Sequence, residues 1–201
     1  MIVRWGLAEL AALAGERPFV VASERWRGVL DAEARWEEVP SHRIEVPVGV
    51  DTIVAVGGGS AIDTAKAASA SSGLPLVSVP TTYSGAEWTA FYGVRDPGRR
   101  MRGGGGGANL RAIVYEPELT LGLPIPETVG TALNALAHAA EALYVRERTA
   151  ESDRDALEGA RLIAAWLPRV VERPDDPEAR TGLLRGACHA GAALGGSMLA
   201  L

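Results

Sequence analysis

The stretch that decides the fold is TIVAVGGGSAIDTAK, residues 52–66. It opens with residues 52–56, a run rich in β-branched side chains that is typical of a strand covered on both faces in a parallel sheet. A glycine turn, residues 57–60, follows directly, and residues 61–71 favour a helix. Residues 74–79 form a second apolar run of strand length. Strand, turn, helix and strand in this order predict a βαβ unit.

Shorter patterns precede this unit. Residues 7–14 have helical spacing, residues 19–22 form an apolar run after Pro18, and residues 35–39 are a possible further strand. Residues 41–50 contain Pro and Gly without a clear period, which predicts a loop.

The chain changes character after the unit. Residues 83–112 are predicted to be irregular, because the five glycines at 103–107 are too flexible for a helix or a central strand. A possible strand at 112–115 comes next. Three strongly helical segments then follow, at 128–146, 151–172 and 178–201. The fold class is therefore α/β: an open parallel-sheet, Rossmann-like nucleotide-binding domain over residues 1–123, then an all-α segment over residues 124–201.

Composition excludes several classes of partner. The net charge is -5 and the basic residues are scattered, so nucleic acid is not an expected partner. Cys188 is the single cysteine, and it cannot form an internal disulfide. No apolar run reaches the roughly 20 residues that span a bilayer. We expect a cytoplasmic protein that acts on a small molecule.

The glycine turn is a candidate phosphate site. Gly57, Gly58, Gly59 and Ser60 join a strand to a helix. Backbone N–H groups and the positive end of the helix dipole converge there, and glycine lets a ligand approach the backbone closely. The alternative is a tight turn that binds nothing.

Hydroxyl side chains follow the next predicted strand. Thr81, Thr82 and Ser84 come after its carboxyl end, where open α/β sheets bind their ligands. They could hydrogen-bond the amide or the ribose of a cofactor. The alternative is a solvated polar loop.

A third candidate lies on the first strong helix. Asn134, His138 and Glu141 share one helical face by their spacing. An Asn and a His one turn apart can reach one ligand or one metal ion. The alternative is a core histidine with a local hydrogen bond.

Four blocks in this order resemble the iron-containing alcohol dehydrogenases. They are VAVGGGSAIDTAKA (54–67), SVPTTYSGAEWTAFYGV (78–94), VYEPELTLGLP (114–124) and NALAHAAEALY (134–144). The tyrosine in the second block and the asparagine that opens the fourth resemble the maleylacetate reductase branch of that family.

The resemblance implies roles for these residues. Residues 57–60 would cradle the pyrophosphate of NAD(H) or NADP(H), and Asp63 would help anchor that turn. Thr81, Thr82 and Ser84 would line the ribose and the nicotinamide. The implied reaction is hydride transfer to a small oxo-acid or carbonyl substrate, with maleylacetate as the expected example. The rival hypothesis is a dinucleotide-binding protein without turnover.

The resemblance leaves two readings of the helical site. His138 matches a metal ligand of the family, which implies Fe or Zn. Asn134 occupies the position of an aspartate ligand in the iron-dependent members. Because asparagine is neutral and a poor ligand, a site that gives the substrate hydrogen bonds is the alternative. We take both residues as the candidate catalytic pair.

The end of the sequence leads to a further expectation. Residues 186–201 carry no Asp, Glu, Lys or Arg, and the family's remaining histidine ligands would lie beyond Leu201. We expect a truncated form or one piece of a split enzyme. A second copy or a partner chain would then cover the apolar C-terminal helix.

Overall fold

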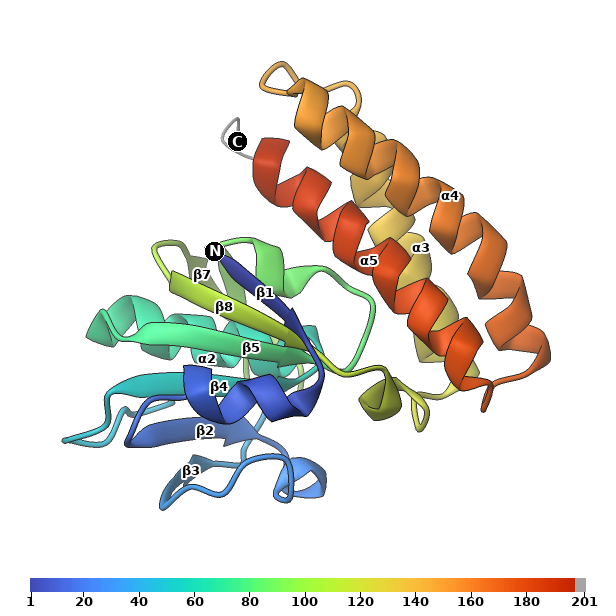
Figure 1. Cartoon of the computed structure of the whole chain (residues 1–201). Helices are drawn as coiled ribbons and strands as arrows, with labels where there is room; N and C mark the ends of the chain where they lie inside the picture. The colour runs from blue at the N-terminus through green and yellow to red at the C-terminus, as the bar shows by residue number, and fades with distance from the viewer. Residues whose placement is uncertain (198–201) are drawn as a thin grey trace. The chain divides into compact units, whose positions relative to one another are not determined.

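The computed structural model describes residues 1–197, and its contacts divide them into two compact units. The sheet unit comprises residues 1–80 and 90–116. The helical unit comprises residues 81–89 together with the chain from Pro117 onward. The segment 81–89 therefore belongs with the helices, although sheet residues flank it on both sides (Figure 1).

A six-stranded parallel sheet forms the sheet unit, which confirms the predicted α/β class. Its strand order is β1 (Ile2–Trp5), β8 (Asn109–Tyr115), β5 (Pro75–Pro80), β4 (Thr52–Gly57), β2 (Pro18–Ala22), β3 (Ala34–Trp36). All six residues of β4 are buried, as its β-branched run predicts for a central strand.

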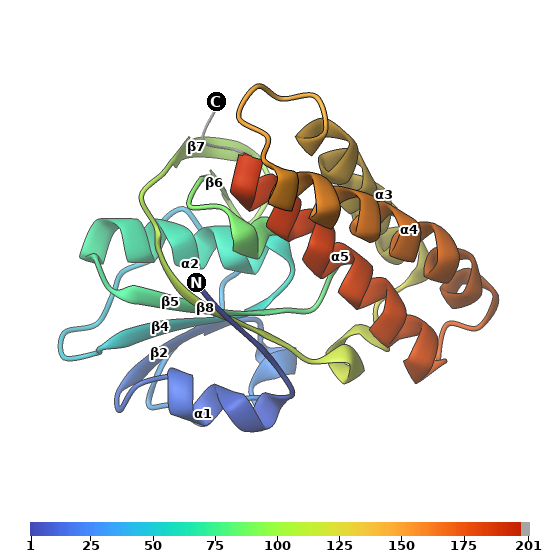
Figure 2. The ribbon, with the colours of Figure 1, turned by 45° about the horizontal axis from the view of Figure 1, so that its top comes forward.

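Helices cover both faces of this sheet. Figure 2 shows α2 (Gly59–Ser72) on one face and the short α1 (Leu10–Leu13) on the other. Helix α2 buries Ile62 and three of its alanines, Ala61, Ala65 and Ala68. It ends at Gly73, whose φ of 75° is left-handed. Glycine is the usual residue at such a helix end. Short 3₁₀ helices lie at Leu7–Glu9 and Glu24–Trp26.

The prediction that residues 83–112 are irregular is wrong. They include a 3₁₀ turn (Ala86–Trp88), an antiparallel hairpin of β6 (Tyr92–Arg95) and β7 (Met101–Gly105), and the start of β8. The glycines of β7 lie at an exposed edge, where no core packing is required. A Cβ on Gly104 would lie 2.8 Å from the Tyr92 carbonyl oxygen, so glycine permits this close strand pairing.

Three long helices follow the 3₁₀ turn Pro117–Thr120, as predicted: α3 (Ile125–Ala142), α4 (Ala150–Glu172) and α5 (Pro177–Ser197). Each contacts the other two. Thr149 and Ser152 form a reciprocal capping box at the start of α4. None of the helices within residues 1–197 combines the length and the apolar character that crossing a bilayer requires.

The C-terminal helix is better packed than the sequence suggested. Between residues 186 and 197, α5 buries six small side chains or glycines: Gly186, Ala187, Ala190, Gly191, Ala193, Ser197. Helix α4 and Trp88 of segment 81–89 lie against this part of α5. The expectation that this helix lacks packing partners is therefore wrong for the described residues, and positions 198–201 lie outside them.

Candidate functional site

The glycine turn presents unused backbone donors. Gly57 has a φ of 150°, and a Cβ there would lie 2.8 Å from the Cβ of Ala61. Gly58 caps α2 without a side-chain hydrogen bond. Within residues 1–197, the N–H groups of Gly59 and Ser60 have no acceptor, because the intrahelical bonds begin with Ala61. A chain bend with open N–H groups at a helix start fits a phosphate group.

Asp63 contacts the hairpin and a lysine of its own helix. Its carboxylate accepts a hydrogen bond from the backbone N–H of Gly93 at 3.4 Å and lies 3.4 Å from Lys66 Nζ. Lys66, which is 1% exposed, also donates to the Phe91 carbonyl at 2.8 Å. Burial raises the pKa of Asp63, although the Lys66 ammonium and the Gly93 N–H oppose that effect. The pair ties α2 to the β6 hairpin rather than to the glycine turn.

The predicted hydroxyl residues lie in segment 81–89, within the helical unit. Thr81 is buried, whereas Thr82 and Ser84 are half-buried, and the Thr82 hydroxyl lies 3.4 Å from that of Ser84. The backbone of this segment contacts α3 directly. The Tyr83 N–H donates to Thr131 Oγ1 at 3.4 Å, and the Ser84 carbonyl accepts from Asn134 Nδ2 at 3.2 Å.

The predicted face of α3 forms a short chain of hydrogen bonds. Asn134 Nδ2 lies 3.0 Å from His138 Nε2, and His138 Nδ1 lies 3.3 Å from Glu141 Oε2. Since the Ser84 carbonyl only accepts, the atom of Asn134 that faces it is the amide nitrogen. That nitrogen then donates to Nε2, so the proton of neutral His138 is assigned to Nδ1. His138 is half-buried, and Asn134 is exposed.

The described residues do not fit a divalent metal at His138. Zinc and iron sites in proteins generally need three or more protein ligands. Among residues 1–197, no three His, Cys, Asp or Glu side chains are grouped to hold an ion. The Nε2 atom that would ligate the metal faces the amide of Asn134 instead.

The candidate residues thus form two groups, one in each unit. Gly57, which begins the glycine turn, pairs with Pro80 at the carboxyl ends of β4 and β5. The chain passes from Pro80 into the helical unit, where Ser84, Asn134 and His138 are in contact. Sequence reasoning missed three participants, the buried Tyr83 and Arg180 and the half-buried Thr131. Nothing in the local sequence around Arg180 distinguishes it from a surface arginine.

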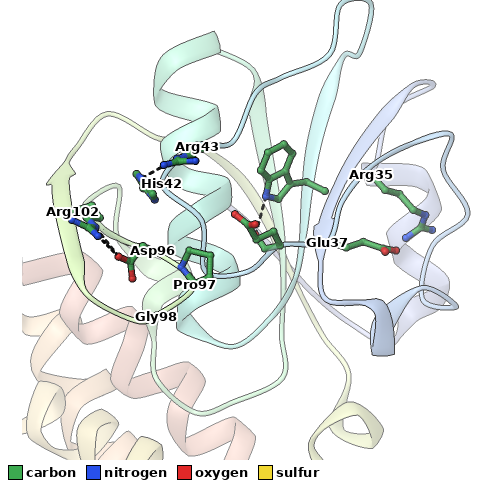
Figure 3. Close-up of a pocket in the computed structure, with 10 residues that line it drawn as sticks. Arg35, Glu37, His42, Arg43, Asp96, Pro97, Gly98 and Arg102 are labelled. Atoms are coloured by element: carbon green, nitrogen blue, oxygen red, sulfur yellow. Dashed lines mark hydrogen bonds and ion pairs between the residues drawn. The ribbon is translucent and has the colours of Figure 1, made fainter.

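The sheet unit also contains a cavity of about 590 Å³ (Figure 3). Residues after β3, such as His42 and Arg43, form one wall, and the β6–β7 turn forms another. Asp96 fixes that turn, accepting from the Arg100 N–H at 2.9 Å and from Arg102 Nε at 2.7 Å. The Arg100 N–H, and then the Arg102 guanidinium, hold the pKa of Asp96 below its usual range against the effect of burial.

Comparison with known proteins identifies the family in both parts of the chain. The model "Iron-containing alcohol dehydrogenase" matches residues 43–113, and the model "Fe-containing alcohol dehydrogenase family, C-terminal" matches residues 128–201. Maleylacetate reductase of Burkholderia cepacia is 46% identical over 154 residues, which are 77% of this chain and 44% of that protein. Maleylacetate reductase 1 of Cupriavidus pinatubonensis is 34% identical, covering 92% of this chain and 58% of the relative.

Solved structures show the same relationship. The crystal structure of maleylacetate reductase from a Rhizobium species superposes with a TM-score of 0.82 at 30% identity, over 96% of this chain and 63% of that one. This chain spans about half the length of the curated relatives it matches. The glycine turn, strands β4 and β5 and most of the three long helices lie within the matched ranges. The chain therefore belongs to the iron-containing alcohol dehydrogenase family.

Proposed function

We propose that this chain supplies the nucleotide-binding part and the first helices of an NAD(P)H-dependent oxidoreductase of the maleylacetate reductase type. The observation that carries the proposal is the pair of open N–H groups at Gly59 and Ser60, at the start of α2. The names of the relatives support the reaction class.

The proposed cofactor site uses residues from the first two sequence blocks, residues 54–67 and 78–94. Gly57, Gly58, Gly59 and Ser60 would hold the pyrophosphate, because their backbone admits an anion next to the helix start. Thr81, Thr82 and Ser84 would hydrogen-bond the ribose and the nicotinamide amide. When bound, the reduced nicotinamide supplies a hydride to the substrate.

His138 and Asn134 would act on the substrate. Hydride addition to a carbon–carbon double bond conjugated to a ketone places negative charge on the ketone oxygen and leaves one carbon to be protonated. Protonated His138 has two N–H donors. Nδ1 would keep its bond to Glu141, while Nε2 would turn from the Asn134 amide to the substrate and transfer the proton. The Asn134 amide would then stabilise the developing oxyanion.

The test is calorimetric titration of the purified chain with NADH and NADPH, repeated on Gly58→Asp. We expect the aspartate to weaken binding at least thirtyfold, about 2 kcal/mol, because its charge repels the pyrophosphate. Gly58 has a φ of -80° in the extended region, where aspartate is also a good helix cap, so the variant should fold.

Gly58→Asn is the matched control, since it has the same size without the charge. We expect it to bind more tightly than the aspartate variant. Equal affinity of wild type and Gly58→Asp, or no binding by the folded wild type, would contradict the cofactor site. Binding without maleylacetate turnover would instead support a dinucleotide-binding protein that lacks activity.

We also propose that a second copy or a partner chain covers part of the helical unit. The support is a set of large apolar side chains exposed on α3 and α4, namely Leu133, Leu157 and Val171. A contiguous exposed apolar patch is typical of an interface, and the proposal takes these side chains to belong to one. Sedimentation equilibrium should give a mass above 21.0 kDa, and Leu157→Glu should shift the population toward monomer. A wild-type chain that stays monomeric at tens of micromolar would exclude the second copy.

A further inference from the structure

Arg180 on α5 is a buried cation with neutral partners. Arg180 is 0% exposed, and its guanidinium donates to the Pro174 carbonyl at 2.8 Å and to the Leu123 carbonyl at 3.1 Å. It also donates to Thr128 Oγ1 at 2.9 Å and lies 3.4 Å from Tyr83 Oη. No carboxylate among residues 1–197 lies within 4.0 Å of it. Burial of an unpaired charge is unfavourable, so neutral acceptors alone must offset it.

Those acceptors come from four different segments. Pro174 belongs to the α4–α5 turn, and Leu123 precedes α3. Thr128 lies on the first turns of α3, and Tyr83 lies in segment 81–89. Arginine suits this arrangement, because its planar group carries five donors with fixed directions. A lysine has one nitrogen and cannot reach all four acceptors at once.

The contact with Tyr83 is the first of a series along α3. Thr128, Thr131, Asn134 and His138 follow one another on the same stripe of this helix. Arg180 joins Thr128 to the Tyr83 hydroxyl, the Tyr83 N–H binds Thr131, and the Ser84 carbonyl binds the Asn134 amide. The Asn134 amide in turn binds His138. The register of residues 83–84 on α3 therefore decides which way the amide points.

We propose that Arg180 is a positioning residue that acts through Tyr83. It anchors residues 81–84 in register on α3, and this keeps the Asn134 amide directed at His138 Nε2. The Tyr83 ring is 0% exposed, so neither Tyr83 nor Arg180 touches a substrate. The catalytic consequence rests on the proposed function, whereas the positioning itself does not.

The experiment compares wild type with Tyr83→Phe and Arg180→Lys. The control is Tyr144→Phe, which removes a hydroxyl from a side chain in an exposed position. The readouts are backbone amide exchange at Tyr83 and the ¹⁵N resonances of the His138 ring. The chain has only three histidines, so the ring signals can be assigned.

We expect Tyr83→Phe to speed exchange of the Tyr83 amide at least tenfold and to shift the His138 ring toward a mixture of tautomers. Arg180→Lys should do the same to a greater extent, and Tyr144→Phe should change neither readout. A role of Arg180 in helix packing alone would leave the His138 ring unchanged. If Arg180→Lys fails to fold, Tyr83→Phe decides the question.

Turnover provides a second, separable readout. In a wild type that reduces maleylacetate, Tyr83→Phe should lower kcat at least tenfold when kcat is measured at saturating NADH. A wild type without turnover counts against the proposed function, and the His138 resonances still test the positioning. Unchanged resonances and amide exchange in a folded Tyr83→Phe would overturn the inference.

Discussion

Replacing Lys66 with methionine is expected to lower the free energy of unfolding at pH 7 by about 3 kcal/mol. Methionine keeps most of the buried hydrocarbon of the lysine side chain. The loss of stability therefore measures the contribution of the ammonium group. Without that group, the hydrogen bond from Nζ to the Phe91 carbonyl is lost, and the Asp63 carboxylate loses the nearer of the two positive charges that act on it, those of Lys66 and Arg95. Removing one partner of a buried pair leaves the other charge poorly solvated. Because the Asp63 side chain is 28% exposed, we expect a loss of stability at the lower end of the range for breaking a buried ion pair.

The loss of stability in Lys66→Met should become larger as pH rises. Burial raises the pKa of Asp63 in the folded chain, so its ionisation lowers stability as pH rises through that value. Removing Lys66 raises the pKa of Asp63 further. The difference between wild type and Lys66→Met should therefore widen as pH rises through this range and shrink at acid pH, where Asp63 is neutral.

Urea denaturation at a series of pH values measures this difference. The double variant Asp63→Asn, Lys66→Met removes both charges. At pH 7 it should be more stable than Lys66→Met alone, and its deficit should be nearly independent of pH. A Lys66→Met deficit below about 0.5 kcal/mol, the level of an ordinary surface change, would show that the ammonium contributes little.

The second large effect is expected at Gly159 on α4. A Cβ there would lie 2.7 Å from the backbone nitrogen of Ala190 and 3.1 Å from the Gly186 carbonyl oxygen on α5. Backbone atoms cannot turn away as a side chain can, so the two helices must separate. We expect Gly159→Ala to lower the free energy of unfolding by about 3 kcal/mol, the upper range of overpacking.

The same substitution at Gly130 serves as the control. Gly130 is an exposed position within α3, and a Cβ there meets nothing within 4 Å. Alanine in that setting should stabilise the helix by about 1 kcal/mol. Thermal unfolding should therefore move in opposite directions for the two variants. Equal shifts would mean that helix propensity, rather than the α4–α5 contact, determines the response at Gly159.

The sequence predicted the parts of the fold that local pattern controls. The β-branched run at 52–56 and the glycines after it specify a buried strand and a tight turn, and both are present. Strand β1 was missed because Ile2–Trp5 is mostly exposed and has no apolar run. The hairpin was missed because its glycines, which favour no regular structure by themselves, are held by pairing with β6.

Long-range contacts explain what the sequence could not predict about the site. The face shared by Asn134, His138 and Glu141 follows from helical spacing alone, and the structure confirms it. The partner of Asp63 lies 30 residues away on the hairpin. Arg180 is an exception to the rule that arginines lie at the surface, and three of its four acceptors come from segments distant in sequence.

The placement of segment 81–89 has a consequence for the order in which the chain folds. The chain leaves the sheet unit after Pro80, returns at Ala90 and leaves again after Glu116. During synthesis, Tyr83 emerges 97 residues before Arg180, which is roughly 5–20 s at ordinary translation rates. The sheet can close once residue 116 is made, before the helices that contact the inserted segment have been synthesised. Synthesis of α5, rather than formation of the sheet, therefore sets the time at which Arg180 can bind Tyr83.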